Sequence, residues 1–175
     1  RIGASSVDAT RLITPIDAAV RFVQQTEQLQ FGAFAVKEDT LENDAGKSFY
    51  ALRGKYRHES WQTGLLLTHT ERPFIARNAR SVAWDSQYQS GTWSMQSTLM
   101  HSDISHRQAS QQGNGMSFKL GYQFSANTQF ESSYLRLDEQ FDVSDLGYIK
   151  RNNWRNWQGE LSHSINFDSA SITRI

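Results

Sequence analysis

The sequence predicts an all-β fold, an antiparallel up-and-down meander that forms a transmembrane β-barrel or a large part of one. Three observations lead to this prediction. Apolar and polar residues alternate with a period of two, the alternating segments are about ten residues long, and short and long connections take turns between them. Ten residues at ~3.3 Å each, tilted by ~45°, cover about 23 Å of the membrane normal, close to the ~25 Å apolar band of such barrels. Strands of soluble proteins are shorter, with about five or six residues.

The clearest alternation covers residues 116–125. Apolar side chains from Met116 to Phe124 fall on one side of this segment, and polar or small ones from Ser117 to Ser125 on the other. A helix would mix the two sets, whereas a strand separates them. The same pattern predicts strands at 16–25, 48–59, 81–89 and 156–167, and, with less cleanly sorted faces, at 29–40, 61–70, 92–102 and 128–137.

The connections between these segments alternate in length. Tight turns are predicted at 26–27, 60, 90–91 and 126–127. Longer polar loops are predicted at 41–47, 71–80, 103–115 and 138–153. Outer-membrane barrels combine short periplasmic turns with longer extracellular loops, so we expect the four longer loops to face the outside.

The charged residues decide which face of the strands meets lipid. A Lys or Arg facing lipid near the midplane costs ~2–4 kcal/mol, so three of them on one strand could approach ~10 kcal/mol, comparable with the stability of a whole domain. We therefore expect the polar face to line the lumen. Ser86, Ser97 and His163 run against the pattern, because they fall on the lipid-facing side. The residues predicted to line the lumen are Arg21, Arg53, Lys55, Arg57, Asp85, Lys119, Glu131 and Glu160.

Composition excludes several classes of protein. The 175 residues carry a formal net charge of +0, so no overall field attracts nucleic acid. The sequence contains no Cys, and therefore no disulfide framework and no thiolate metal site. No apolar run reaches the ~18 residues of a membrane helix. We expect residues 1–175 to form a single β-barrel region, nine strands and the start of a tenth, that belongs to a longer barrel, because bacterial single-chain barrels have even strand numbers.

One loop carries a family resemblance. Residues 141–153 read Phe-Asp-Val-Ser-Asp-Leu-Gly-Tyr-Ile-Lys-Arg-Asn-Asn. The stretch resembles a loop motif of a large bacterial family, domain of unknown function 5916, in which an aromatic residue, an acidic-Leu/Val-Gly-aromatic core and an Arg lie between two barrel strands. Residues 78–85 are similar to a strand opening of that family, with Trp84 at a position where Gly is expected, and residues 32–36 resemble a strand after a short turn. The motif residues carried over are Phe141, Asp145, Leu146, Gly147, Tyr148 and Arg151.

The resemblance implies an outer-membrane β-barrel of a Gram-negative bacterium. It also implies a carbohydrate-binding-like β domain elsewhere in the same chain. It implies no activity, because none is known for the family.

Candidate catalytic and metal sites have ordinary structural explanations. No Ser/His/Asp set is recognisable, so we expect no enzyme and no cofactor. Lumen carboxylates such as Glu131 could act as acid and base, but we expect them to offset the lumen cations instead. His69, His101 and His106 lie near loop ends without a known ligand spacing, and the acidic loop at 138–145 lacks the oxygen spacing of a calcium site. In that loop we expect Asp142 and Asp145 to cap turns and to pair with Lys150 and Arg151, and the loop to fold over the barrel mouth.

The expected function is an outer-membrane pore, gated passage or membrane anchor that takes part in the uptake of a solute or glycan. Outer-membrane lipid is then the main partner, and no nucleic acid is expected. Two alternatives stay open: a soluble β-barrel or β-sandwich that binds a glycan or hydrophobic ligand, and a barrel enzyme. The aromatic residues fit either a membrane girdle or sugar stacking, with the girdle favoured. They are Trp61, Trp84, Tyr88, Trp93, Tyr122, Tyr134, Trp154 and Trp157.

Overall fold

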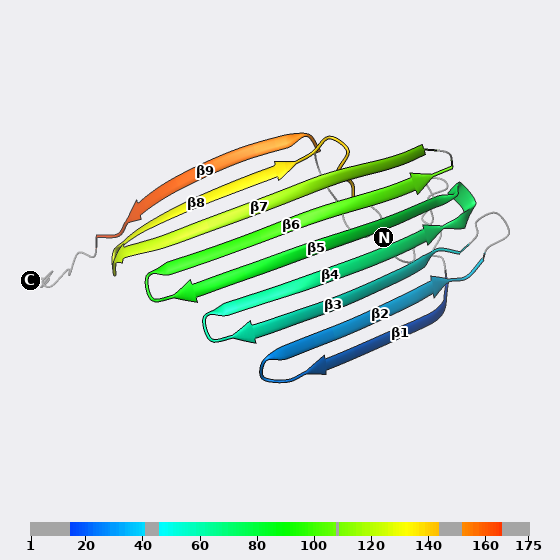
Figure 1. Cartoon of the computed structure of the whole chain (residues 1–175), viewed down its shortest axis with the longest axis horizontal. Coiled ribbons are helices and arrows are strands. Elements are labelled where there is room, and N and C mark those ends of the chain that lie inside the picture. The colour runs from blue at the N-terminus through cyan, green and yellow to red at the C-terminus, as the bar shows by residue number, and fades with distance from the viewer. Residues whose placement is uncertain (1–14, 41–45, 108, 144–151, 166–175) are drawn as a thin grey trace, which may run out of the picture.

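The protein forms one open antiparallel sheet (Figure 1). The structure, a computed structural model, describes residues 15–40, 46–107, 109–143 and 152–165. Its strands follow one another in chain order, and β1 and β9 form the two edges, so the described sheet is not closed. The strands are β1 (Ile16–Gln25), β2 (Leu29–Glu38), β3 (Ser48–His58), β4 (Trp61–Arg72), β5 (Arg77–Ser90), β6 (Trp93–His106), β7 (Ala109–Ser125), β8 (Thr128–Leu137) and β9 (Trp154–His163).

This architecture confirms the predicted fold class, an antiparallel meander of long strands. Each predicted strand is present, and every neighbouring pair is antiparallel. The predicted tight turns are also present, with left-handed backbone at Glu59 and Gly91. The two ends of the sheet will be called the short-turn end, where β1–β2, β3–β4, β5–β6 and β7–β8 connect, and the opposite end.

Two predicted long loops are wrong. The residues at 71–80 form the end of β4, a 3₁₀ turn at Pro73–Ile75 and the start of β5. The residues at 103–115 belong mostly to β6 and β7, which pair as far as His106 and Ala109. Apart from Ile104, these extensions carry polar or small side chains on both faces. The alternation that marks a strand in the sequence is therefore lost there, although the backbone pairing continues. The strict alternation of short and long connections therefore does not hold.

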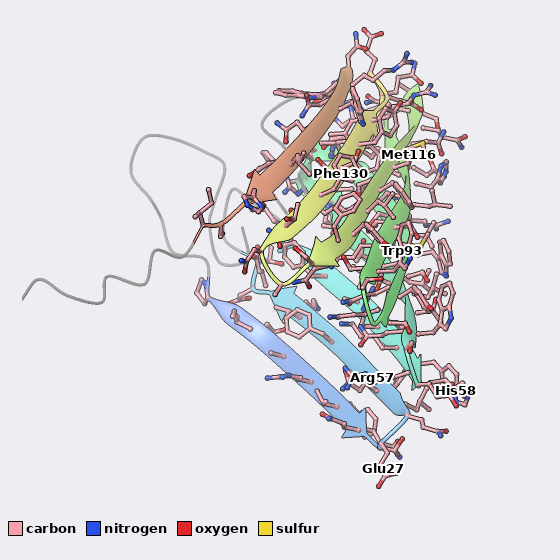
Figure 2. The ribbon with its side chains drawn as sticks, turned by 90° about the vertical axis from the view of Figure 1, so that its left-hand side faces the viewer. Glu27, Arg57, His58, Trp93, Met116 and Phe130 are labelled. Carbon is pink, nitrogen blue, oxygen red and sulfur yellow. The ribbon has the colours of Figure 1, made fainter. Side chains whose placement is uncertain are left out.

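The sheet is curved, and its two faces differ in chemistry. Figure 2 shows β1 and β9 on the left with the strands between them displaced to the right. Arg57 points to the left, concave side, and its neighbour His58 points to the right, convex side. Because directly paired residues share a face, the strand register assigns every other paired residue to one of these two faces.

A small core lies on the concave face at the end opposite the short turns. Val36, Phe49, Thr70 and Ile104 occupy one row of the sheet and are each at most 4% exposed. The neighbouring Ser102 is fully buried as well. Glu38, at the end of β2, is also buried, at 1% exposed. The other side chains of the described sheet are half-buried or exposed, as expected for one layer without a second sheet packed against it.

Candidate functional site

The concave face gathers all the residues predicted to line a lumen. The register places these eight charged residues on one face of the sheet, although they come from six strands. The common face is what the sequence pattern required. They are Arg21 on β1, Arg53, Lys55 and Arg57 on β3, Asp85 on β5, Lys119 on β7, Glu131 on β8 and Glu160 on β9.

An ion pair lies at the middle of this face. The guanidinium of Arg53 contacts the carboxylate of Asp85 across β4, and both side chains are less than one third exposed. Gly64 lies between them on β4, where a Cβ would come within 2.9 Å of Arg53 Nη2 and 3.1 Å of Asp85 Oδ1. The missing side chain at position 64 therefore lets two strands that are not neighbours share a salt bridge. Such a contact fits the expectation that carboxylates on this face offset its cations.

Closer to the short-turn end, the face is polar and open. A groove of about 730 Å³ lies over β6–β9 and is lined by Lys119, Glu131 and Glu160, among others. Glu131 stands directly opposite Glu160 in the strand register, and both side chains are exposed. Gly121 leaves room for the Ser94 side chain at the floor of the groove, because a Cβ at position 121 would collide with Ser94 Oγ. The groove offers charged and hydrogen-bonding groups to water and solutes.

Residues 138–143, which follow β8, fold back onto the concave face. Phe141 is 1% exposed and lies against β7. A Cβ on Gly113 would come within 2.2 Å of the Phe141 backbone nitrogen, and one on Gly115 would touch its ring. Asp142 then pairs with Arg77 at 3.0 Å, and its backbone N–H donates to Ser102 Oγ.

The remaining residues of the loop motif lie outside the described residues, and so do Lys150 and the predicted end of the last strand. The positions concerned are Asp145, Leu146, Gly147, Tyr148 and Arg151.

Sequence reasoning missed several groups that hold this loop. Arg77 lies in a predicted loop, whereas in the structure it begins β5 and binds Asp142. Gly113 and Gly115 also lie in a predicted loop, although two glycines spaced by two residues indicate a strand that another backbone approaches closely on one face. The buried row from Val36 to Ile104 gave no distinct signal, because its members come from four separate strands.

The convex face is apolar and exposed. Most of the large hydrophobic side chains that are exposed belong to it, including Leu52, Leu65, Leu99 and Phe118. A soluble monomer rarely exposes a contiguous apolar patch larger than a few hundred Å², so this face requires something to cover it. Of the predicted exceptions, Ser86 and Ser97 pair with each other on the convex face. His163 lies at the short-turn end, where its Nδ1 is 2.8 Å from Thr128 Oγ1.

Aromatic rings form close pairs at the short-turn end of the convex face. The ring centroids of Trp61 and Tyr88 are 4.7 Å apart, and those of Trp93 and Tyr122 are 4.5 Å apart. Trp93 projects from the convex side in Figure 2. Trp154, by contrast, shares the concave face with Leu137. The cross-strand pairs make a row of amphipathic rings along one edge of the apolar surface, which is the arrangement expected of an interfacial girdle.

The histidines do not converge on a metal site. His69 and His101 lie on the convex face, and His106 lies on the concave one. His69 Nε2 is 2.9 Å from Glu71 Oε1, and His101 Nδ1 is 2.9 Å from Asn114 Oδ1. In the described part of the chain, no three His, Asp or Glu side chains are close enough together to hold a metal ion.

Comparison with protein families identifies a match over residues 65–174, more than half of the chain, to the domain of unknown function DUF5916. The chain belongs to this family. The DUF5916 match begins within β4 and includes the loop motif and residues 78–85, whereas the resemblance at 32–36 precedes it. Comparisons with curated proteins and with solved structures each gave no match. No helix among the described residues is long and apolar enough to cross a membrane.

Proposed function

We propose that this DUF5916 chain is part of a β-barrel in the bacterial outer membrane, with its convex face against lipid and its concave face lining the lumen. In that barrel the charged concave residues select which solutes pass, or fill the interior of a membrane anchor. The observation that carries the proposal is the course of the apolar surface across the convex face.

The apolar surface has a sharp boundary at the end opposite the short turns. On each strand from β3 to β9, the last apolar residue of the convex face is followed, two positions further out, by a polar one. The last apolar residues are Tyr50, Leu67, Val82, Leu99, Met116, Tyr134 and Trp157.

This boundary crosses the strands obliquely, in regular steps. Tyr50 pairs with His69, so the boundary residue Leu67 lies two positions nearer the short turns. Leu67 and Val82 are paired, and the boundary then advances by two positions to Leu99. The same step recurs between β7 and β8, because Met116 pairs with Arg136 rather than with Tyr134. The boundary thus shifts by six residues over the six strand intervals from β3 to β9.

A shift of one residue per strand has a geometric meaning. With ~3.3 Å per residue along a strand and ~4.8 Å between strands, the boundary becomes level when the strands tilt by about 35°. Membrane barrels have strand tilts of about 35–45°. A flat membrane surface therefore fits this boundary at the tilt that barrels adopt. The core of a β-sandwich places no such requirement on the boundary.

The opposite edge of the surface steps in the same direction. At the short-turn end, the outermost aromatic residue of the convex face is Tyr56 on β3 and Trp61 on β4, and Trp61 lies two positions further toward the turns. The same step of two positions separates Tyr88 on β5 from Trp93 on β6. The hairpin turns themselves are displaced in the same sense, which Figure 1 shows as successive turns extending further to the left. At a 35° tilt the apolar surface from Met116 to Phe124 covers roughly 22 Å of the membrane normal, near the ~25 Å of known barrels.

The open edges of the sheet are part of the proposal. Neither β1 nor β9 is paired on its outer side within the described sheet. Lipid cannot satisfy the backbone N–H and C=O groups of an open edge, so further strands must pair with both.

Fractionation of the full-length protein tests the proposed function. We expect the protein in the outer-membrane fraction, with different gel mobility before and after boiling in detergent. Conductance across a planar bilayer then separates a pore from a closed anchor. A full-length protein that stays soluble and monomeric without detergent would contradict the proposal, and binding of glycans to the exposed aromatic rings would become the leading alternative.

A further inference from the structure

A band of basic residues adjoins the apolar boundary on one side only. We call this band the basic border. It consists of the convex-face residues immediately beyond the last apolar residue of each strand from β2 to β9, at the end opposite the short turns. Four of its members are Lys or Arg, two are His, and none is acidic. They are Lys37, Ser48, His69, Arg80, His101, Asn114, Arg136 and Arg155.

The short-turn edge of the apolar surface lacks such a band. The convex-face residues beyond the apolar surface there are neutral or imidazole side chains, among them Gln24, His58, Ser90 and Thr128, and no Lys or Arg of the described strands occupies a position at that edge. The two rims of the apolar surface are therefore chemically different. Charge of one sign at one rim indicates a partner of the opposite sign on that side alone.

The border contains a like-charge pair. Arg136 on β8 stands directly opposite Arg155 on β9, and like charges in that position destabilise a sheet. Asp138 lies 3.2 Å from Arg136 Nη2, in a pair whose side chains are 48% and 31% exposed. An anion between the two guanidinium groups would relieve their repulsion, and arginine presents a planar fork of N–H donors that matches phosphate oxygens.

The acidic groups near the border lie beyond it. Glu71 is the next convex-face residue after His69, and Asp103 is the next after His101 and stands opposite Arg80. On β4 and β6 the convex face therefore presents an apolar, then an imidazole, then an acidic side chain, and on β8 Asp138 follows Arg136. In a bilayer the phosphate groups of the lipids lie directly outside the hydrocarbon region, at the level where this order places the basic border.

We infer that the basic border binds the phosphate groups of lipid headgroups at the membrane surface opposite the short turns. The inference rests on the proposed function, since it requires a bilayer around the convex face. The strongest contact is at Arg136 and Arg155, two cations that stand opposite each other on neighbouring strands. Lys37 and Arg80, both exposed, extend the border across the sheet.

Native mass spectrometry of the full-length protein in detergent tests the inference. The probes are dilauroyl phosphatidic acid, dilauroyl phosphatidylcholine and inorganic phosphate, and the readout is the Kd of each. We expect tighter binding of phosphatidic acid than of phosphatidylcholine. The substitutions Arg136→Gln and Arg155→Gln should each raise the Kd of phosphatidic acid by about fivefold. This follows from ~1 kcal/mol of attraction per basic residue near a membrane surface.

Matched variants separate the border from net charge. Arg21→Gln with Lys119→Gln removes the same charge from the concave face and should leave the Kd of phosphatidic acid unchanged. Arg136→Lys with Arg155→Lys keeps the charge and should retain most of the binding of phosphatidic acid. This lysine pair keeps the inference testable if the glutamine pair folds poorly. An equal loss of phosphatidic acid binding in the concave-face variant, or no loss of binding in the border variant, would overturn the inference.

Three further outcomes identify the source of failure. If inorganic phosphate binds Arg136 and Arg155 as tightly as phosphatidic acid does, the border is a simple anion site and the assignment to lipid is wrong. If the protein shows no heat-dependent change in gel mobility, the proposed function fails before lipid is considered. A heat-modifiable barrel with no preference for phosphatidic acid would leave the proposed function standing and overturn the inference alone.

Discussion

Phe118 and Ser117 are adjacent on β7 and point to opposite faces, so they provide a matched test of which face meets lipid. Phe118 lies on the convex face, two positions inside the apolar boundary at Met116, and is 36% exposed. Ser117 lies on the concave face in the same row as Asp85. An arginine at either position adds the same charge to the same strand.

The expected cost differs between the two positions. Phe118→Arg places a guanidinium in the hydrocarbon region, which costs ~2–4 kcal/mol near the midplane of a barrel. Ser117→Arg places it in water on the polar face, in the row that contains the Asp85 carboxylate. Surface substitutions of this kind change stability by about ±0.5 kcal/mol. We therefore expect the Phe118 variant to be less stable by roughly 2–3 kcal/mol.

Urea titration of the full-length protein refolded into phosphatidylcholine vesicles measures this difference, with the fraction of heat-modifiable protein as the signal. A difference of roughly 2–3 kcal/mol moves the folded-to-unfolded ratio by roughly 30-fold to 160-fold. Equal destabilisation by the two variants would refute the assignment of faces. Greater destabilisation by Ser117→Arg would reverse the assignment, and the concave face would then be the lipid-facing one.

Three other predictions concern the concave face. Phe141→Ala should destabilise the protein by about 3–5 kcal/mol or detach the loop after β8, because the ring is 1% exposed; urea titration together with proteolysis of the loop measures both. Gly113→Ala should release the same loop, since the added Cβ would come within 2.2 Å of the Phe141 backbone, and its proteolysis rate should match that of Phe141→Ala. Asp85→Asn leaves the Arg53 guanidinium without its charged partner, so a double-mutant cycle with Arg53→Gln should give a coupling energy of about 1 kcal/mol, and additive effects would show that the pair contributes nothing.

The sequence predicted the strands best where one face is apolar. The alternation at 116–125 reappears as the convex and concave faces of β7, and the eight charged residues share one face because a period of two leaves no other arrangement. It failed where both faces are polar. The segments 77–80 and 109–115 continue their strands through backbone pairing alone. Backbone pairing does not require apolar and polar side chains to alternate, so the sequence pattern does not reveal it.

The candidate site was predictable only in part. Charged residues on one face follow from the pattern, but the contact between Arg53 and Asp85 depends on Gly64 and on the register of three strands. The position of the loop after β8 depends on Gly113, whose missing side chain admits the Phe141 backbone. The oblique boundary of the apolar surface required the register of every strand pair, which alternation within single strands cannot supply.

Membrane depth at three positions tests the central claim most directly. The 175 residues contain no Cys, so single cysteines can be introduced at Tyr50, Gln112 and Met116 in a full-length background without other cysteines. A fluorophore on each cysteine is quenched by spin labels at known bilayer depths. Tyr50 and Gln112 share a row of the sheet, whereas Tyr50 and Met116 share the apolar boundary.

A barrel with strands tilted by about 35° puts Tyr50→Cys and Met116→Cys at the same depth, with Gln112→Cys about 11 Å further toward the water. Equal depths at Tyr50→Cys and Gln112→Cys, with Met116→Cys deeper, would mean that the strands do not tilt as the apolar boundary requires. Absence of quenching at all three positions would contradict contact between the convex face and lipid.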